Sequence, residues 1–210
     1  NTPGQNSNAV AELAIGMMIF MSRGQFKGVS GTELKGKTVG VYGCGNIGRR
    51  VARIAQGLGM RVVALDPCIT KVSMEPYDIK VVQSVDELFS ASDFLSLHIP
   101  ANDKTKKSVN FDLMSKMPKG ATVINTARKE VIDEDGLKKI LEERPDFKYI
   151  SDIAPSNHAD LDGKFELRYY STPKKQGAET SEANVNAGVA AAEQIVAFFE
   201  SGDQTYRVNR

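Results

Sequence analysis

The sequence predicts an α/β protein built on a doubly wound parallel sheet. Seven short runs of apolar and β-branched residues alternate with segments of helical pattern, and such alternation is typical of this fold class. Each run is short and mostly apolar throughout, as strands covered on both faces are. The predicted strands are 38–42, 61–65, 79–82, 94–97, 122–124, 149–153 and 169–171.

Helical patterns fill the intervals between the strands and occupy both ends of the chain. The helices expected between strands are 47–58, 85–91, 111–114 and 133–143. Asp133 is the expected N-cap of the last of these, and Gly136, a poor helix former, is tolerated inside it. Two further helices are expected at 8–23 and 181–201, and Gly202 should end the second in the usual C′ role.

The two terminal helices carry more apolar surface than one sheet face requires. Helix 8–23 is apolar almost all round from Leu13 to Met21, although one stripe would suffice to pack on a sheet. We therefore expect a subunit interface there, with a deeply buried core helix as the alternative. Helix 181–201 should place four side chains against an apolar partner: Val189, Ile195, Val196 and Phe199.

Composition excludes several functional classes. The 27 basic and 26 acidic residues of this 210-residue chain nearly cancel, which argues against nucleic-acid or anionic-membrane binding. The most apolar stretch has nine residues, short of the roughly 20 of a membrane helix, and no signal peptide is visible. Cys44 and Cys68 lack metal-ligand spacing and are too few for a disulfide framework, so we expect no metal site and a cytoplasmic location. The first residue is Asn1 rather than Met, so we expect a piece of a longer protein.

A glycine-rich motif, Gly43-Cys44-Gly45-Asn46-Ile47-Gly48, follows strand 38–42 and opens a helix. In such a loop Gly43 permits the tight turn, Gly45 lets the backbone approach a pyrophosphate, and Gly48 lets the helix lie close on the strand. The helix N-terminus offers free N–H groups to the phosphates. The motif predicts a Rossmann-type dinucleotide site, with a purely structural glycine turn as the alternative.

Asp66 ends the next predicted strand and favours NAD over NADP. A carboxylate at this place accepts hydrogen bonds from the ribose hydroxyls and repels a 2′-phosphate. Lys71, nearby in the sequence, is the feature that weighs toward NADP.

Further sequence blocks occur in a fixed order around the glycine loop: 1–4 (NTPG), 10–13 (VAEL), 34–40 (LKGKTVG), 92–100 (SDFLSLHIP), Thr105, 124–128 (INTAR) and 152–153 (DI). Together they resemble the D-isomer-specific 2-hydroxyacid dehydrogenases over essentially the whole chain. The resemblance implies hydride transfer between NAD and the C2 carbon of a 2-hydroxy or 2-keto acid. The members most similar to this chain interconvert 3-phosphoglycerate and 3-phosphohydroxypyruvate, the first step of phosphorylated serine biosynthesis.

The resemblance also implies a domain organisation. Residues 1–180 correspond to the NAD-binding Rossmann domain, including helix 8–23, through which family members form homodimers. Residues 181–210 correspond to a C-terminal helix and tail that return to the substrate-binding domain, most of which is absent from this chain.

Two catalytic residues follow from the resemblance. Arg128 matches the family's catalytic arginine, which can clamp a substrate carboxylate and polarise the keto oxygen; Lys129 stands where the family usually has Gly. The family's catalytic His, in a Thr-Pro-His motif, is replaced here by Lys174, and the Glu that holds it is replaced by Asn157. The two changes agree, because a carboxylate beside a lysine would only bind its proton more tightly. Lys174 is therefore the expected proton donor.

Alternatives to Lys174 follow from the same region. Lys175 could be the aligned lysine, His158 is a rival acid, and both lysines could be solvated loop charges of a silent site. The positive charge of Arg128, Lys129 and the two lysines is consistent with a phosphorylated substrate.

The remaining contacts with NAD are implied by the resemblance alone. They are Gly43, Gly45, Asn46, Ile47 and Gly48 in the loop, Asp66, His98, Ile99, Pro100, Thr105, Thr126, Ala127 and Asp152. Asp152 would accept a bond from the nicotinamide amide, with a buried turn aspartate as the alternative. Competing functions are a glyoxylate or hydroxypyruvate reductase of the same family, a non-catalytic NAD-sensing module and a catalytically silent fragment.

Overall fold

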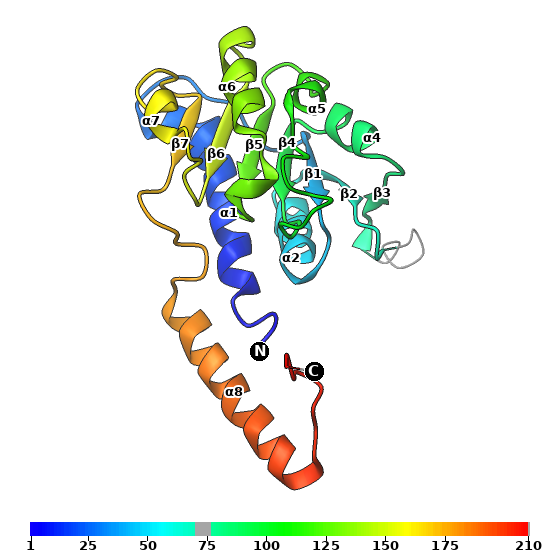
Figure 1. Ribbon diagram of the computed structural model, residues 1–210. Coiled ribbons are helices and arrows are strands. Elements are labelled where there is room, and N and C mark those ends of the chain that lie inside the picture. The colour runs from blue at the N-terminus through cyan, green and yellow to red at the C-terminus, as the bar shows by residue number, and fades with distance from the viewer. Residues whose placement is uncertain (70–76, 210) are drawn as a thin grey trace.

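The computed structural model describes residues 1–69 and 77–209. Within them seven parallel strands form one sheet in the order β3-β2-β1-β4-β5-β6-β7 (Figure 1). The strands are β1 Thr38–Tyr42, β2 Arg61–Leu65, β3 Lys80–Val81, β4 Phe94–Leu97, β5 Thr122–Asn125, β6 Lys148–Ser151 and β7 Tyr169–Ser171. Each lies at a predicted position, so the predicted doubly wound parallel sheet is confirmed.

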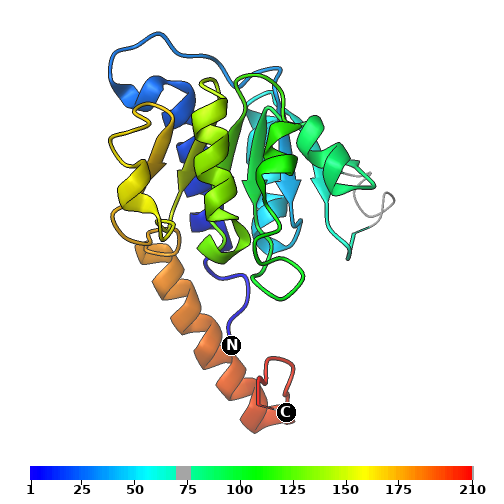
Figure 2. The same cartoon turned by 45° about the horizontal axis from the view of Figure 1, so that its top comes forward.

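Helices cover both faces of the sheet and enclose two separate cores (Figure 2). One face carries α1 (Ser7–Ser22) and α2 (Asn46–Gly57). The other face carries α4 (Val85–Ser90), α5 (Phe111–Ser115), α6 (Glu134–Glu143) and α7 (His158–Leu161). The sequence did not predict α7 or the 3-10 turns η1 (Gly24–Phe26) and η3 (Lys129–Val131).

Strand order reverses between β1 and β4, because β2 and β3 lie on one side of β1 and the later strands on the other. In open α/β sheets, ligands bind outside the carboxyl ends of the strands at this switch point. The fold therefore places a ligand site beside the turns that follow β1 and β4.

The start of α6 corrects one detail. Asp133 occupies the N-cap position, as predicted, but its side chain makes no capping hydrogen bond. Gly136 is more than tolerated: a Cβ there would lie 2.8 Å from Asp133 Oδ2 and 2.8 Å from the Phe111 backbone nitrogen. Close packing of α6 against the start of α5 thus requires glycine at this position.

Helix α1 is a core helix within this chain. Its most extensive contacts are with α2, and Ala11, Ala14, Met18 and Met21 are fully buried. The core-helix interpretation therefore accounts for most of its apolar residues. A contact with a second copy remains a prediction.

Helix α8 (Ser181–Ser201) projects away from the sheet (Figure 1). It is capped by the Thr180 hydroxyl, which accepts the Ala183 N–H, and ends at Gly202 in the left-handed region (φ 72°), as predicted. No apolar surface among the described residues buries this face, so the expected apolar partner stays a prediction. The side chains are exposed: Val189 52%, Ile195 59%, Val196 52% and Phe199 81%.

No helix among residues 1–69 and 77–209 has the length and apolarity needed to cross a membrane.

Candidate cofactor and substrate site

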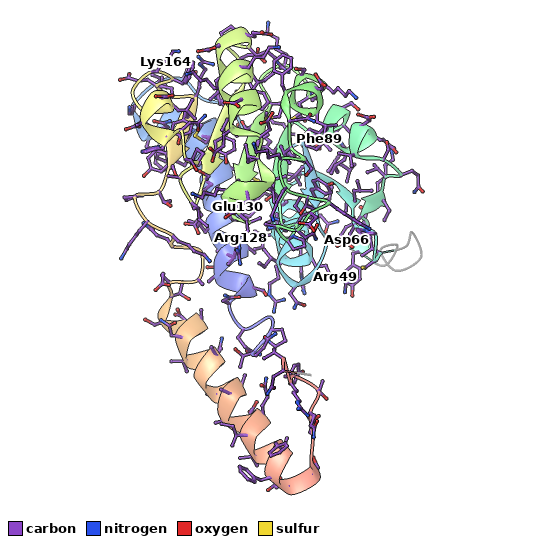
Figure 3. The ribbon with its side chains drawn as sticks, viewed as in Figure 1. Arg49, Asp66, Phe89, Arg128, Glu130 and Lys164 are labelled. Atoms are coloured by element: carbon purple, nitrogen blue, oxygen red, sulfur yellow. The ribbon has the colours of Figure 1, made fainter. Side chains whose placement is uncertain are left out.

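The predicted site residues gather at one edge of the sheet, where the strands have their carboxyl ends. The glycine loop follows β1, Asp66 follows β2 and His98 follows β4. Arg128 follows β5 and Asp152 follows β6, so five neighbouring strands supply the site. Asp66, Arg49 and Arg128 lie along this edge in Figure 3.

Two glycines of the loop are required by packing. Gly43 has a φ of 88°, and a Cβ there would lie 2.8 Å from the carbonyl carbon and oxygen of His98. A Cβ on Gly48 would lie 2.2 Å from the Gly43 carbonyl oxygen and 2.9 Å from Val41 Cγ1. The turn after β1, the turn after β4 and the start of α2 therefore close on one another without room for side chains.

Gly45 is different, because packing among the described residues does not require it. A Cβ on Gly45 would meet no described atom within 4 Å, and its φ of −77° is not in the left-handed region. Gly45 is the N-cap of α2 and offers no side chain to the free N–H groups of the first turn. Open space beside free N–H groups at a helix N-terminus fits a pyrophosphate. Asn46 and Ile47 form this first turn, with Asn46 exposed and Ile47 half-buried.

Asp66 joins the glycine loop to the turn after β2. Its Oδ2 accepts the Cys44 N–H at 2.7 Å, and its Oδ1 accepts the Cys68 N–H at 2.8 Å. A carboxylate has about four lone-pair directions, so room remains for ribose hydroxyls. Lys71, the residue that weighed toward NADP, lies outside the described residues.

The substitution Asp66→Ala should relax the cofactor preference. Loss of the carboxylate removes both the acceptor for the ribose and the repulsion of a 2′-phosphate, so the NADH-to-NADPH affinity ratio should fall about tenfold or more. Nicotinamide fluorescence titration measures both affinities, and Asp112→Ala, which removes an exposed carboxylate from α5, is the control. An unchanged ratio would remove Asp66 from the ribose role.

The turn after β4 contributes one buried polar atom that has no hydrogen-bond partner among the described residues. The His98 side chain contacts Ser96 Oγ through Nε2 at 2.9 Å, and its buried Nδ1 is the atom without a partner there. Burial lowers the pKa of His98 to about 4, so its ring is neutral at neutral pH and unsuited to donate a catalytic proton. Ile99 is buried and Pro100 exposed beside it.

The buried hydroxyl of Thr126, after β5, also has no hydrogen-bond partner in the described part of the chain. Buried polar atoms are rarely left unsatisfied. Thr126 and His98 therefore fit a site that awaits a polar ligand, and both were predicted as cofactor contacts.

Thr105 holds the loop that follows Pro100. Its hydroxyl donates to the Pro100 carbonyl and accepts the Asn102 N–H at 2.9 Å. The structure thus gives Thr105 a role within the loop, and its contact with the cofactor stays a prediction.

Asn125, which was not among the predicted site residues, shapes the segment that carries Arg128. Its side-chain Oδ1 accepts the Ala127 N–H at 3.0 Å, and its Nδ2 donates to the Arg128 carbonyl at 3.0 Å. The same Nδ2 lies 3.2 Å from the Tyr149 hydroxyl. A buried amide at the end of a strand was the available signal, since such a group must find partners.

The Arg128 guanidinium is exposed at this edge. Its Nη1 donates to the Ala127 carbonyl at 2.8 Å, and it pairs with no carboxylate among the described residues. Its remaining donors are free to form a bidentate pair with a substrate carboxylate.

Asp152 anchors the loop that carries the two lysines. The carboxylate is 1% exposed and accepts the Gln176 N–H at 2.7 Å, the Gly177 N–H at 2.8 Å and the Thr172 hydroxyl at 3.2 Å. These bonds match the alternative of a buried turn aspartate, and the nicotinamide contact stays a prediction. Lys174 and Lys175 are both exposed on this loop, so exposure does not distinguish them.

Asn157, at the position of the family's Glu, and its neighbour His158 both form hydrogen bonds away from the lysine loop. Asn157 Nδ2 donates to the Glu134 carbonyl at 2.9 Å, and His158 Nδ1 lies 2.7 Å from the Tyr169 hydroxyl. Lys129 Nζ reaches Ser156 Oγ at 3.3 Å. His158 is thus held against β7, which disfavours it as the rival acid.

Comparison with known proteins agrees with this geometry. A family model described as "D-isomer specific 2-hydroxyacid dehydrogenase, NAD binding domain" matches residues 12–175. The D-3-phosphoglycerate dehydrogenase of Methanocaldococcus jannaschii is 33% identical over 93% of this chain and 40% of its own length. The hydroxypyruvate reductase of Thermotoga maritima is 40% identical over 65% of this chain and 48% of its own length.

A solved structure, the NAD+-bound 3-phosphoglycerate dehydrogenase of Entamoeba histolytica, is 48% identical with a TM-score of 0.91. The match covers 100% of this chain and 67% of that one. The chain spans less than half the length of the two curated relatives named above.

Proposed function

Because the chain belongs to the D-isomer-specific 2-hydroxyacid dehydrogenase family, we propose that it interconverts 3-phosphoglycerate and 3-phosphohydroxypyruvate with NAD as cofactor. The observation that carries the proposal is the unpaired Arg128 guanidinium at the edge of the sheet that holds the glycine loop. Curated relatives named D-3-phosphoglycerate dehydrogenase, at 31% to 35% identity, support the choice of substrate.

Each residue has a distinct part in the proposed reaction. Bound NAD supplies the acceptor or donor of the hydride at C2. Gly45 and the first turn of α2 hold its pyrophosphate, and Asp66 holds the adenosine ribose. Arg128 holds the substrate carboxylate and polarises the C2 oxygen. Lys174 gives that oxygen its proton during reduction and removes it during oxidation.

Turnover of NADH tests the proposal. We expect rapid NADH consumption at neutral pH with 3-phosphohydroxypyruvate and slower consumption with unphosphorylated hydroxypyruvate, followed by absorbance at the nicotinamide band. Equal or faster turnover of hydroxypyruvate would favour the second candidate, a hydroxypyruvate reductase, which the Thermotoga maritima relative supports. Binding of NADH without turnover of either acid would favour an NAD-sensing module. The replacement of the family's His and Glu by Lys174 and Asn157 is the feature that supports this candidate.

The substitution Arg128→Ala should weaken both binding and chemistry. Loss of the bidentate contact with the carboxylate should lower kcat/KM for the keto acid about 100-fold or more, because the contact acts in the ground state and in the transition state. Steady-state kinetics separate KM from kcat. Arg53→Ala, which removes an exposed arginine from α2, is the matched control and should leave both unchanged.

We propose further that residues 181–210 dock on a substrate-binding domain and that α1 contributes to a homodimer. The exposed apolar side chains of α8 support the first part. A cluster in which Phe20 contacts Phe26 and Tyr170 edge-on, at 5.4 and 4.9 Å between ring centroids, supports the second. A cytoplasmic location is proposed with these, since Cys44 and Cys68 are unpaired.

A further inference from the structure

A cavity lies at the opposite edge of the sheet from the glycine loop. It has a volume of about 200 Å³ and is lined by residues at the amino ends of four neighbouring strands. Lys37 precedes β1, Asp93 precedes β4, Lys119 precedes β5 and Lys148 opens β6. Strands of four or five residues separate this cavity from the cofactor edge by about 15 Å, so it belongs to a different site.

Three ammonium groups line this cavity without carboxylate partners. Lys37, Lys119 and Lys148 form no ion pair with any acidic group in the described part of the chain. Lys148 is half-buried, and its Nζ donates one long bond, 3.4 Å, to the Met21 carbonyl in the last turn of α1. The other protons of that ammonium group have no acceptor among the described residues.

Asp93 is the one acidic residue in the lining, and it is partly engaged. Its Oδ2 accepts the Thr38 backbone N–H at 2.8 Å. No ammonium group of the described residues lies within ion-pair distance of Asp93, so the Asp93 carboxylate forms no direct ion pair with any of the three lysines. Three positive charges against one negative charge leave the hollow with a net charge of +2.

The lysines also act on one another. Burial, and next the charge of Lys37, lowers the pKa of Lys148. Like charges held together in a recess destabilise the empty site, and an anion between them relieves that repulsion. The chain as a whole carries a net charge of only +1, so this concentration of positive charge is local.

Two hydroxyl groups complete the lining. Ser22 and Thr32 come from the end of α1 and the segment after it, and a backbone bond of 2.8 Å from the Thr32 N–H to the Ser22 carbonyl holds them together. The Ser22 hydroxyl already donates to the Ile19 carbonyl at 2.9 Å, so the Thr32 hydroxyl is the neutral donor that remains for a phosphate oxygen beside the ammonium groups. The volume equals the liquid share of several water molecules, enough for a phosphate group with a short carbon chain.

We propose that this cavity binds a phosphate group, free or esterified, between Lys37, Lys119 and Lys148. The site is independent of the proposed dehydrogenase activity, since its residues lie at the other edge of the sheet.

Isothermal titration calorimetry tests the site by measuring the affinity and stoichiometry of two probes, inorganic phosphate and glycerol 2-phosphate. The second probe lacks a carboxylate for Arg128, and comparison of the two affinities distinguishes free from esterified phosphate. Titrations in the Gly45→Val background, where a side chain fills the space beside the first turn of α2, remove binding at the glycine loop. We expect saturable one-to-one binding of at least one probe, weakened by higher salt because the contacts are electrostatic.

Variants assign the binding to the cavity. Lys148→Met keeps the buried carbon chain and removes the charge, and it should weaken binding about tenfold. Lys119→Gln changes an exposed residue that leaves the core untouched, so a loss of affinity there cannot come from unfolding. The control Lys164→Gln removes the same charge from an exposed pair with Glu142 and should change nothing. Absence of saturable binding, or equal weakening in Lys164→Gln, would overturn the proposal.

Discussion

The substitution Gly45→Val is expected to abolish NADH binding while leaving the fold intact. Gly45 has a negative φ of −77°, and a Cβ there would meet no described atom within 4 Å. The free energy of unfolding should therefore change by about 0.5 kcal/mol or less, as for other exposed substitutions. The side chain would instead occupy the space beside the free N–H groups of α2, and the affinity for NADH should fall at least about 100-fold because the pyrophosphate loses these donors.

A matched substitution three residues later, Gly48→Ala, should instead destabilise the fold. Gly48→Ala places a Cβ 2.2 Å from the Gly43 carbonyl oxygen, so α2 must move away from β1. Such overpacking costs up to about 3 kcal/mol of unfolding free energy. Denaturant unfolding and nicotinamide fluorescence titration measure the two effects separately. If Gly45→Val bound NADH normally, the glycine loop would not be the pyrophosphate site.

Most of the fold could be predicted because local pattern and tertiary environment agree. Strands such as β4 and β5 are buried along their whole length and are mostly apolar, and helices such as α2 and α6 have the period of an amphipathic helix. Helix α7 has four residues and no period to detect. It is positioned by contacts from distant parts of the chain, such as that between His158 and Tyr169, which no local pattern contains.

The site residues also differ in whether local sequence pattern or tertiary structure determines their roles. The glycine loop and Asp66 could be predicted because their roles follow from local conformation and from their places after two strands. The bonds of Asn125 to Ala127 and Arg128, and those of Asp152 to the loop 172–177, depend on side-chain direction after folding. Local sequence pattern therefore does not reveal the role of Asn125, and for Asp152 it predicts a buried turn carboxylate only as the alternative.

The exposed apolar face of α8 shows that a sequence pattern can identify an apolar helix face without identifying the surface that packs against it. Four apolar side chains on one helix predict burial, yet the surface that buries them is not among the described residues of this chain. Periodicity identifies the face of a helix, and only tertiary structure identifies what lies against it.

The substitution Lys174→Ala is expected to abolish keto-acid reduction while NADH binding stays near normal. Removal of a general acid typically slows the chemical step about 100-fold to 10,000-fold, and kcat should fall accordingly. Asp152 fixes the backbone of the loop through the Gln176 and Gly177 N–H groups, so loss of an exposed side chain should leave the loop in place.

The neighbouring substitution Lys175→Ala is the matched control, because both lysines are exposed and carry the same charge on the same loop. A loss of electrostatic attraction for a phosphorylated substrate would affect the two variants alike and would raise KM. Loss of the proton donor would affect one of them and would lower kcat. A normal rate in Lys174→Ala combined with a low kcat in Lys175→Ala would therefore reassign the acid to Lys175, and normal rates in both would exclude both lysines from the chemistry.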